Sequence, residues 1–113
     1  MINDLIYVYC ISRTPPGLVP GMEDIRLEVL KLDDFYVTVK YVSESEFSEE
    51  NFKRNLSNIQ WLELNAREHI SVITAIMEQR TVIPFKFGTI YHTKDSLINF
   101  ITNYSDSLIE NFL

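Results

Sequence analysis

The stretch from residue 61 to residue 89 decides the fold, and it reads WLELNAREHISVITAIMEQRTVIPFKFGT. Apolar residues recur through its first part at the spacing of one helix face, which predicts a helix from Ile59 to about Gln79. Residue types then alternate from Val82 to Phe87, which predicts a strand that Gly88 ends. A long helix that runs directly into a strand indicates a domain of mixed helix and sheet.

The first half of the chain predicts three more strands. Leu5 to Ile11 is a run of β-branched and aromatic residues, typical of a central strand buried on both faces. A loop rich in proline and glycine follows from Arg13 to Gly21. Two alternating segments, Ile25 to Val29 and Phe35 to Tyr41, flank a turn at Asp33-Asp34 and predict a hairpin.

Polar residues mark the predicted helix starts. Ser48 is the expected N-cap of a helix, because Phe47 and Phe52 occupy the two positions of a hydrophobic staple around it. Ser57-Asn58 is expected to interrupt or re-cap this helix before the long helix, and Thr93 caps a last helix. The expected core face of that last helix comprises Leu97, Phe100, Ile101, Tyr104 and Leu108.

The predicted order is therefore strand, loop, hairpin, helix, strand, helix. It indicates an α+β fold, with a mainly antiparallel four-stranded sheet and helices packed on one face. The layout is closest to a ferredoxin-like sandwich in which a Pro/Gly loop replaces the first crossover helix. With 113 residues, the chain is expected to form a single domain over residues 1–113.

Composition excludes several classes of function. A net charge of −6 argues against a nucleic-acid binder, which usually has a basic face. The apolar runs are much shorter than the roughly 20 residues that cross a bilayer, so no membrane partner is expected. Met1 to Asp4 lacks the basic segment of a signal peptide, and the single Cys10 is expected to be a buried core thiol. These features together predict a cytoplasmic protein.

His69 is the most informative polar residue of the long helix. It lies in the predicted buried stripe, which comprises Leu62, Ala66, His69, Ile73, Ile76 and Met77. A histidine there is either a hydrogen-bonded core residue or the floor of a pocket, and the core interpretation is favoured. Arg67, Glu68 and His69 point about 100° apart on a helix, so they do not converge on one substrate atom.

The motifs of common enzymes and cofactor sites are missing from the sequence. It contains neither the HxxxH nor the CxxC spacing of zinc sites, and neither a nucleophile elbow nor a glycine-rich phosphate loop. We therefore expect no catalytic, cofactor-binding or metal-binding residues, and the predicted protein is not an enzyme.

The segment VIPFKFGT has two compatible interpretations. In an extended strand, Ile83, Phe85 and Phe87 would point to one side, and Val82, Pro84 and Lys86 to the other. The segment is then either a core strand with a tight exit at its glycine, or a strand whose Pro84/Lys86 side is available to a partner.

The same segment carries a resemblance to a known family. Together with Trp61-Leu62, Ala66-Arg67 and His69, it resembles the GvpL/GvpF gas vesicle proteins, in which an Ala-Arg-x-His-like helix element leads to a V-[IL]-P-[LF]-[RK]-F-G-T strand. The likeness extends as a pattern over nearly the whole chain. Lys86 stands where the family often has arginine, which keeps the charge but loses bidentate geometry. Family members are typically longer, so the chain resembles their N-terminal domain or a short member.

The resemblance implies a non-enzymatic accessory or minor structural protein of gas vesicle formation. Such a protein would work in the cytoplasm and at the gas vesicle. During assembly it would bind the hydrophobic major shell protein, and other gas vesicle accessory proteins are further candidate partners. An unpaired sheet edge would allow recruitment by strand addition. The expected docking residues are Arg67, His69, Pro84, Lys86, Gly88 and Thr89.

A second interpretation belongs to a different functional class. The chain would then be a ferredoxin-like small-ligand-binding or regulatory domain. His69, Arg67 and Tyr104 would line a small pocket between helices and sheet.

Overall fold

The computed structural model describes residues 4–17, 19 and 23–112, and its centre is a mostly antiparallel open sheet. The sheet order is β2-β3-β1-β4, and a short fifth strand also pairs with β1. The strands are β1 (Asp4–Ser12), β2 (Glu28–Leu32), β3 (Phe35–Ser43), β4 (Val82–Pro84) and β5 (Ile90–Tyr91). The predicted mixture of helices with a mainly antiparallel sheet is confirmed, whereas the specific ferredoxin-like layout stays a prediction.

Three of the helices that the structure describes begin at the capping residues expected from the sequence. They are α1 (Glu44–Phe47), α2 (Glu49–Asn55), α3 (Ile59–Met77), α4 (Lys94–Asn103) and α5 (Ser105–Glu110). The side chains of Ser48, Asn58 and Thr93 accept backbone N–H groups at the starts of α2, α3 and α4. The predicted last helix is split at Tyr104, whose side chain is 53% exposed instead of buried. None of the helices within the described residues is long and apolar enough to cross a membrane.

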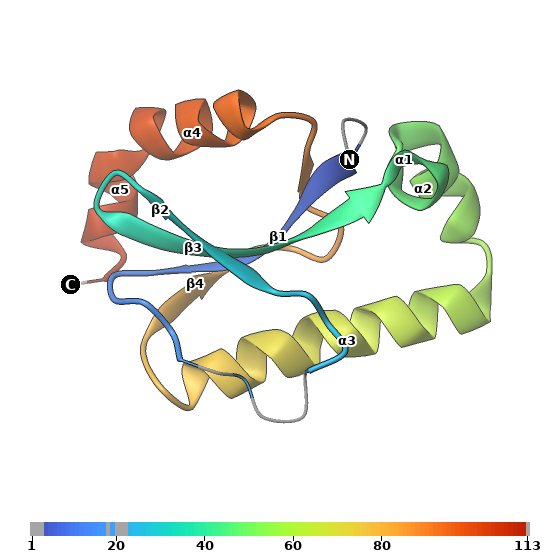
Figure 1. Cartoon of the computed structure of the whole chain (residues 1–113), viewed down its shortest axis with the longest axis horizontal. Helices are drawn as coiled ribbons and strands as arrows, with labels where there is room; N and C mark the ends of the chain where they lie inside the picture. Colours follow the sequence, from blue (N-terminus) through green and yellow to red (C-terminus); the bar gives the residue numbers. More distant parts are fainter. Residues whose placement is uncertain (1–3, 18, 20–22, 113) are drawn as a thin grey trace.

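The helices cover both faces of the sheet, so the prediction of helices on one face is wrong. Figure 1 shows α3 along one face and α4 with α5 on the other. The side chains of β1 divide between these two layers. Ile6, Val8 and Ile11 belong to the α4/α5 core, whereas Leu5, Tyr7, Tyr9 and Cys10 belong to the α3 core. A strand that is apolar on both faces requires cover on both faces, which the sheet obtains from the two helical layers.

The hairpin forms at the predicted turn, with its first strand shifted by three residues toward that turn. Asp33 adopts a left-handed backbone (φ 58°) between β2 and β3. β2 begins at Glu28, so Ile25 and Leu27 lie before the strand. The described part of the preceding loop, residues 13–17 and 19, contains neither helix nor strand, while positions 18 and 20–22 of the predicted loop lie outside the described residues.

The predicted strand from Val82 to Phe87 ends early, at Pro84. The chain then follows the same side of β1 in two pieces, because β4 pairs with Cys10–Ser12 and β5 pairs with Ile6–Tyr7. We call the intervening residues 85–89 the Phe85–Thr89 loop. Only the two ends of this loop form backbone hydrogen bonds with β1. Phe85 N–H donates to the Tyr9 carbonyl (2.9 Å), and Val8 N–H donates to the Thr89 carbonyl (3.0 Å).

Candidate functional site

The Phe85–Thr89 loop is a tight turn that projects Lys86 from the sheet edge. The Lys86 carbonyl accepts both the Thr89 N–H (3.1 Å) and the Thr89 hydroxyl (2.7 Å). The Lys86 side chain is exposed and has no ion pair with any residue that the structure describes. The loop therefore offers a cation at its apex.

Gly88 allows the loop to lie close to α2. Its φ of 85° is a conformation that side-chain-bearing residues rarely adopt. A Cβ atom there would meet the ring of Phe52 at 2.5 Å. The glycine is thus required both by the backbone conformation and by the close approach of the Phe52 ring.

Phe85 and Phe87 lie on opposite sides of the sheet, so the prediction that they point the same way is wrong. Phe85 contacts Phe100 of α4, with ring centroids 5.9 Å apart. Phe87 contacts Tyr7, His69 and Phe52 on the α3 side. The strict alternation of a strand is lost because the backbone turns at Lys86. The loop is consequently anchored in both hydrophobic cores.

His69 connects the two ends of the loop through a chain of hydrogen bonds. Its Nε2 lies 2.9 Å from the Phe85 carbonyl, and its Nδ1 lies 2.8 Å from the Tyr7 hydroxyl. The carbonyl only accepts, so Nε2 carries the proton, and the Tyr7 hydroxyl donates to Nδ1 of the neutral ring. The Tyr7 oxygen in turn accepts the Gly88 N–H (3.3 Å). We call the set of His69, Tyr7, the Phe85 carbonyl and the Gly88 amide the His69 clasp.

The environment of the clasp favours the neutral ring. His69 is only 5% exposed, and burial lowers its pKa below the ordinary 6.5. The Phe85 hydrogen bond and the charge of Glu68 raise the pKa, while Lys40 lowers it. Burial also raises the pKa of Tyr7, so its hydroxyl keeps the proton that the clasp needs.

A second polar group lies beside the clasp on the same face of the sheet. Glu68 accepts the Tyr9 hydroxyl (2.8 Å) and pairs with Lys40 of β3. The Lys40 Nζ also lies over the rings of Tyr7 (5.4 Å) and Tyr9 (6.0 Å). Burial and then Glu68 raise the pKa of Tyr9. Glu68 of α3 thereby links the helix to Tyr9 of β1 and Lys40 of β3.

The structure separates the six predicted docking residues into three environments. Pro84, Lys86, Gly88 and Thr89 lie together on the β4–β5 edge, and Pro84 and Lys86 are exposed. His69 is buried beneath that edge. Arg67 is on the exposed side of α3, where it pairs with Glu63 (2.6 Å). The assignment of these residues to a partner stays a prediction.

The pocket of the ligand-binding interpretation is not formed by its predicted residues. Tyr104 packs on Phe100 at the α4–α5 junction, across the sheet from His69 and Arg67 on α3. The structure therefore places the third predicted lining residue on the opposite face.

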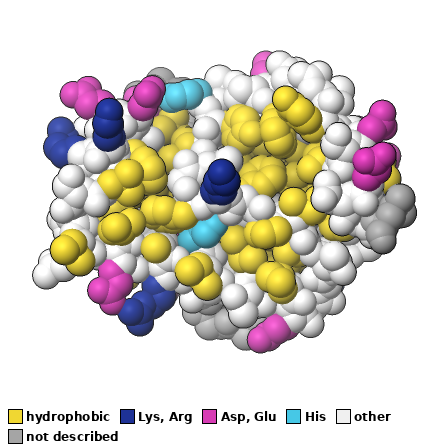
Figure 2. Space-filling model, turned by 180° about the vertical axis from the view of Figure 1, so that it is seen from behind, with side chains coloured by type: hydrophobic (Ala, Val, Ile, Leu, Met, Phe, Trp, Pro, Cys, Tyr) yellow, Lys and Arg dark blue, Asp and Glu magenta, His cyan; other side chains and the backbone are white. Residues whose placement is uncertain are grey.

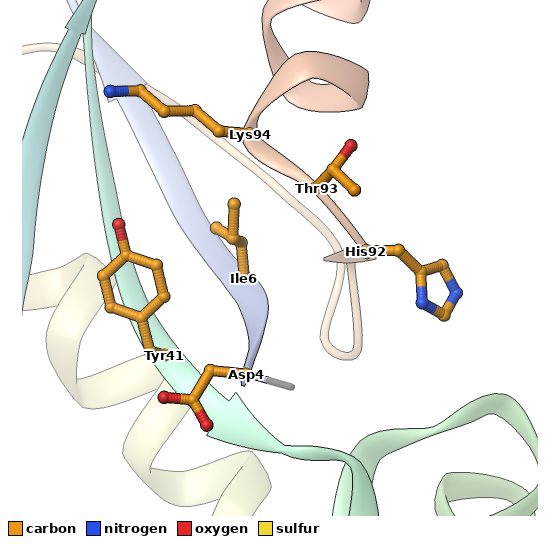
Figure 3. A pocket seen from close by; sticks show the side chains of 6 residues that line it. All are labelled: Asp4, Ile6, Tyr41, His92, Thr93 and Lys94. Carbon is orange, nitrogen blue, oxygen red and sulfur yellow. The ribbon is translucent and has the colours of Figure 1, made fainter. Parts of the chain in front are cut away.

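A different hollow of about 270 Å³ lies between the strands and the start of α4. It is lined by Asp4, Ile6, Tyr41, His92, Thr93 and Lys94. In Figure 3 the His92 ring and the Lys94 ammonium extend away from its centre, so its polar groups do not converge. The described residues also contain no group of three or more potential metal ligands among His, Cys, Asp and Glu. Cys10 is buried as predicted, and burial raises its pKa to about 11.

Sequence reasoning missed Tyr7 and Tyr9, and it treated Lys40 only as part of the exposed side of its strand. The two tyrosines lie in a strand that was interpreted through its apolar neighbours. Tyrosines two residues apart on a buried strand project to the same face, and each hydroxyl then needs a partner there. That spacing, together with the polar pair Glu68-His69 on the predicted helix, was the available signal.

The comparisons with known proteins give one match. The family model for gas vesicle synthesis protein GvpL/GvpF matches residues 5–112, nearly the whole chain. No curated protein and no solved structure shows a significant match.

Proposed function

The chain belongs to the gas vesicle synthesis protein GvpL/GvpF family, and we propose that it is a non-enzymatic accessory protein that binds the hydrophobic major shell protein during assembly. In this proposal it acts in the cytoplasm and at the growing gas vesicle, alone or with other accessory proteins. The observation that carries the proposal is the family match together with the loop that presents Lys86.

The polar network supports a binding role better than a catalytic one. The two nitrogens of His69 are occupied by Tyr7 and Phe85, and Glu68 is occupied by Tyr9 and Lys40. These groups satisfy one another inside the protein, so they stabilise the loop rather than face a substrate. The groups left for a partner are the side chains at the loop apex and the neighbouring helix surface.

Side-chain contacts fit this edge better than strand addition does. β4 has three residues and β5 has two, and the projecting loop separates them. Pro84 lacks an N–H group, and a lysine projects beside it. Short strands, proline, lysine and an interruption are the features that protect natural sheet edges from pairing. We therefore assign the docking to Lys86 and its apolar surroundings.

Co-expression tests the proposal directly. The major shell protein of the same organism is expressed with this chain, and the soluble and co-purified shell protein is measured. We expect more soluble shell protein with the wild-type chain than without it, and a loss of co-purification in the Lys86→Glu, Arg67→Glu variant. Lys31→Glu is the matched control, because Lys31 is an exposed lysine on the opposite edge strand. Undiminished capture by the double variant would remove this surface from the proposal.

A further inference from the structure

Helix α3 carries an exposed apolar line that its own fold does not use. Ile59 is 76% exposed, Ile70 63% and Met77 56%. At about 100° per residue, positions 59, 66, 70 and 77 fall within roughly 20° of one line along the helix. We call Ile59, Ile70 and Met77, with the half-buried Ala66 between them, the α3 stripe. Met77 was predicted to be buried, and its exposure places it in this stripe instead.

The α3 stripe lies on the side of the helix that borders the Phe85–Thr89 loop. Glu68 turns toward Lys40 of β3, and His69, about 100° further round, reaches Phe85. The next residue, Ile70, continues the rotation and projects beyond the β4 edge. Figure 2 shows this rear side of the molecule, where hydrophobic side chains gather around a basic side chain near the middle and acidic groups lie toward the margin.

The spacing of the stripe indicates which kind of partner segment could pack on it. Its intervals of seven, four and seven residues span 18 residues in five turns, so the stripe runs straight along the helix and a second helix can pack beside it. The small side chain of Ala66 allows a second helix to approach near the middle. A strand would instead need a free sheet edge, and β4–β5 does not provide a continuous one.

Lys86 indicates that the segment packed on the stripe should carry a negative charge. Its ammonium group has no ion pair within the described residues, and covering the surrounding apolar surface would remove water from it. A covered cation needs a carboxylate partner, because an unpaired buried charge is costly. A second copy of this chain is a poor candidate, because each copy carries a net charge of −6.

We propose that the α3 stripe and Lys86 form a seat for an amphipathic helix that carries a carboxylate beside its apolar seam. The inference rests on the proposed function only for the source of that helix, a protein of the gas vesicle. The seat itself follows from the exposure of the stripe, its helical spacing and the unpaired lysine beside it.

Two designed helical peptides test the seat with the complete chain. They share one Leu/Ile seam long enough to span α3, and they differ only in one central flanking residue, Glu or Lys. Binding is measured by fluorescence anisotropy. We expect the Glu peptide to bind at least roughly tenfold more tightly than the Lys peptide, because like charges across an interface are repulsive. Lys86→Glu should reverse that order.

The stripe has a matched control on the same helix. Leu64 is 70% exposed but lies about 120° away from Ile70. Ile70→Glu with Met77→Glu should abolish binding of the Glu peptide, and Leu64→Glu should leave it unchanged. All of these positions are exposed, and circular dichroism verifies that each variant is folded. The proposal would be overturned if Leu64→Glu weakened binding as much as the stripe variant does. It would also be overturned if the chain bound the two peptides equally or bound neither peptide.

Three further outcomes separate this inference from self-association and from the proposed function. Self-association of the chain that Ile70→Glu with Met77→Glu abolishes would overturn it in favour of a second copy as occupant. Charge-selective peptide binding without capture of shell protein in co-expression would support the seat and contradict the proposed function. If the variant without the stripe still captures shell protein, the result would support the proposed function and contradict the seat.

Discussion

The two faces of β1 are built from different chemistry. On one face Ile6, Val8 and Ile11 pack against α4 and α5 in a core of apolar side chains. On the other face Tyr7 and Tyr9 carry hydroxyls that reach His69 and Glu68 of α3. A register shift in the pairing with β3 between Val8 and Cys10 allows Tyr9 and Cys10 to lie in the same core.

This difference in chemistry means that the two faces of β1 contribute to the structure in different ways. Dispersion and burial on the α4/α5 face are non-directional, so that face holds the loop only through the packing of Phe85 on Phe100. Hydrogen bonds on the α3 face are directional, and they fix the Phe85 carbonyl and the Gly88 amide on either side of Lys86. Both faces therefore stabilise the fold, and the α3 face also orients the candidate docking loop through directional hydrogen bonds.

The largest expected effect is on the apolar face. Ile101 is fully buried in the α4/α5 core, so Ile101→Ala should lower the free energy of unfolding by about 2–5 kcal/mol, through lost burial and the remaining cavity. Urea denaturation measures the change. The comparison also requires the NMR signals of the His69 ring to stay in place in the folded variant. A shifted His69 ring would show that the two faces are coupled.

Gly88→Ala should have the next largest effect, and it acts on the loop. The left-handed backbone (φ 85°) and the 2.5 Å approach to Phe52 should together cost about 1–3 kcal/mol. Gly17→Ala is the control, because among the described residues a Cβ there meets the Gln79 side-chain oxygen at an ordinary 3.6 Å. Thermal melting of both variants checks this. Equal melting temperatures would contradict the requirement for glycine at position 88.

Breaking the His69 clasp should cost no more than the Gly88 substitution and should loosen one loop only. His69→Phe removes both ring nitrogens and leaves the Phe85 carbonyl and Tyr7 hydroxyl without them, which should cost about 1–3 kcal/mol. Faster hydrogen exchange is expected at the Gly88 amide. His69→Gln offers one acceptor and one donor, so it should restore part of the protection. Exchange that rises equally across β1 would instead indicate general destabilisation.

Sequence patterns predicted the elements better than their arrangement. The buried run in β1, the turn at Asp33-Asp34 and the caps at Ser48 and Asn58 are local signals, and each was confirmed. Periodicity reports which side chains are apolar, but it does not say which helix covers which face. The two-sided burial of β1 already required two helical layers, and that consequence was not drawn from the sequence.

The candidate site was only partly predictable. Its residues Lys86, Gly88 and His69 were singled out from the sequence, and the burial of His69 was the favoured interpretation. The opposite placement of Phe85 and Phe87 was not predictable, because it depends on the turn at Lys86 and on Phe52 packing over Gly88. Tertiary contacts of this kind override the alternation of a strand. The partners of His69 were missed for the same reason.

The smallest expected effect is a pH dependence that belongs to the α3 face alone. The pKa of His69 is lowered in the folded protein, mainly by burial, so the unfolded chain binds the extra proton first as the pH falls. Stability should therefore be full above pH 6.5 and decline below it, with a slope of at most about 1.4 kcal/mol per pH unit from this one group. The groups that face the ring are Glu68, Lys40, Tyr7, Tyr9 and the Phe85 carbonyl.

Urea denaturation between pH 5 and pH 8 measures this slope, with two variants as references. His69→Gln should remove the decline that begins near pH 6.5, because glutamine does not titrate. His92→Gln should keep it, because His92 is exposed and lies outside the clasp. An unchanged decline in His69→Gln would mean that other groups cause it. The neutral His69 would then no longer distinguish the α3 face from the apolar face of β1.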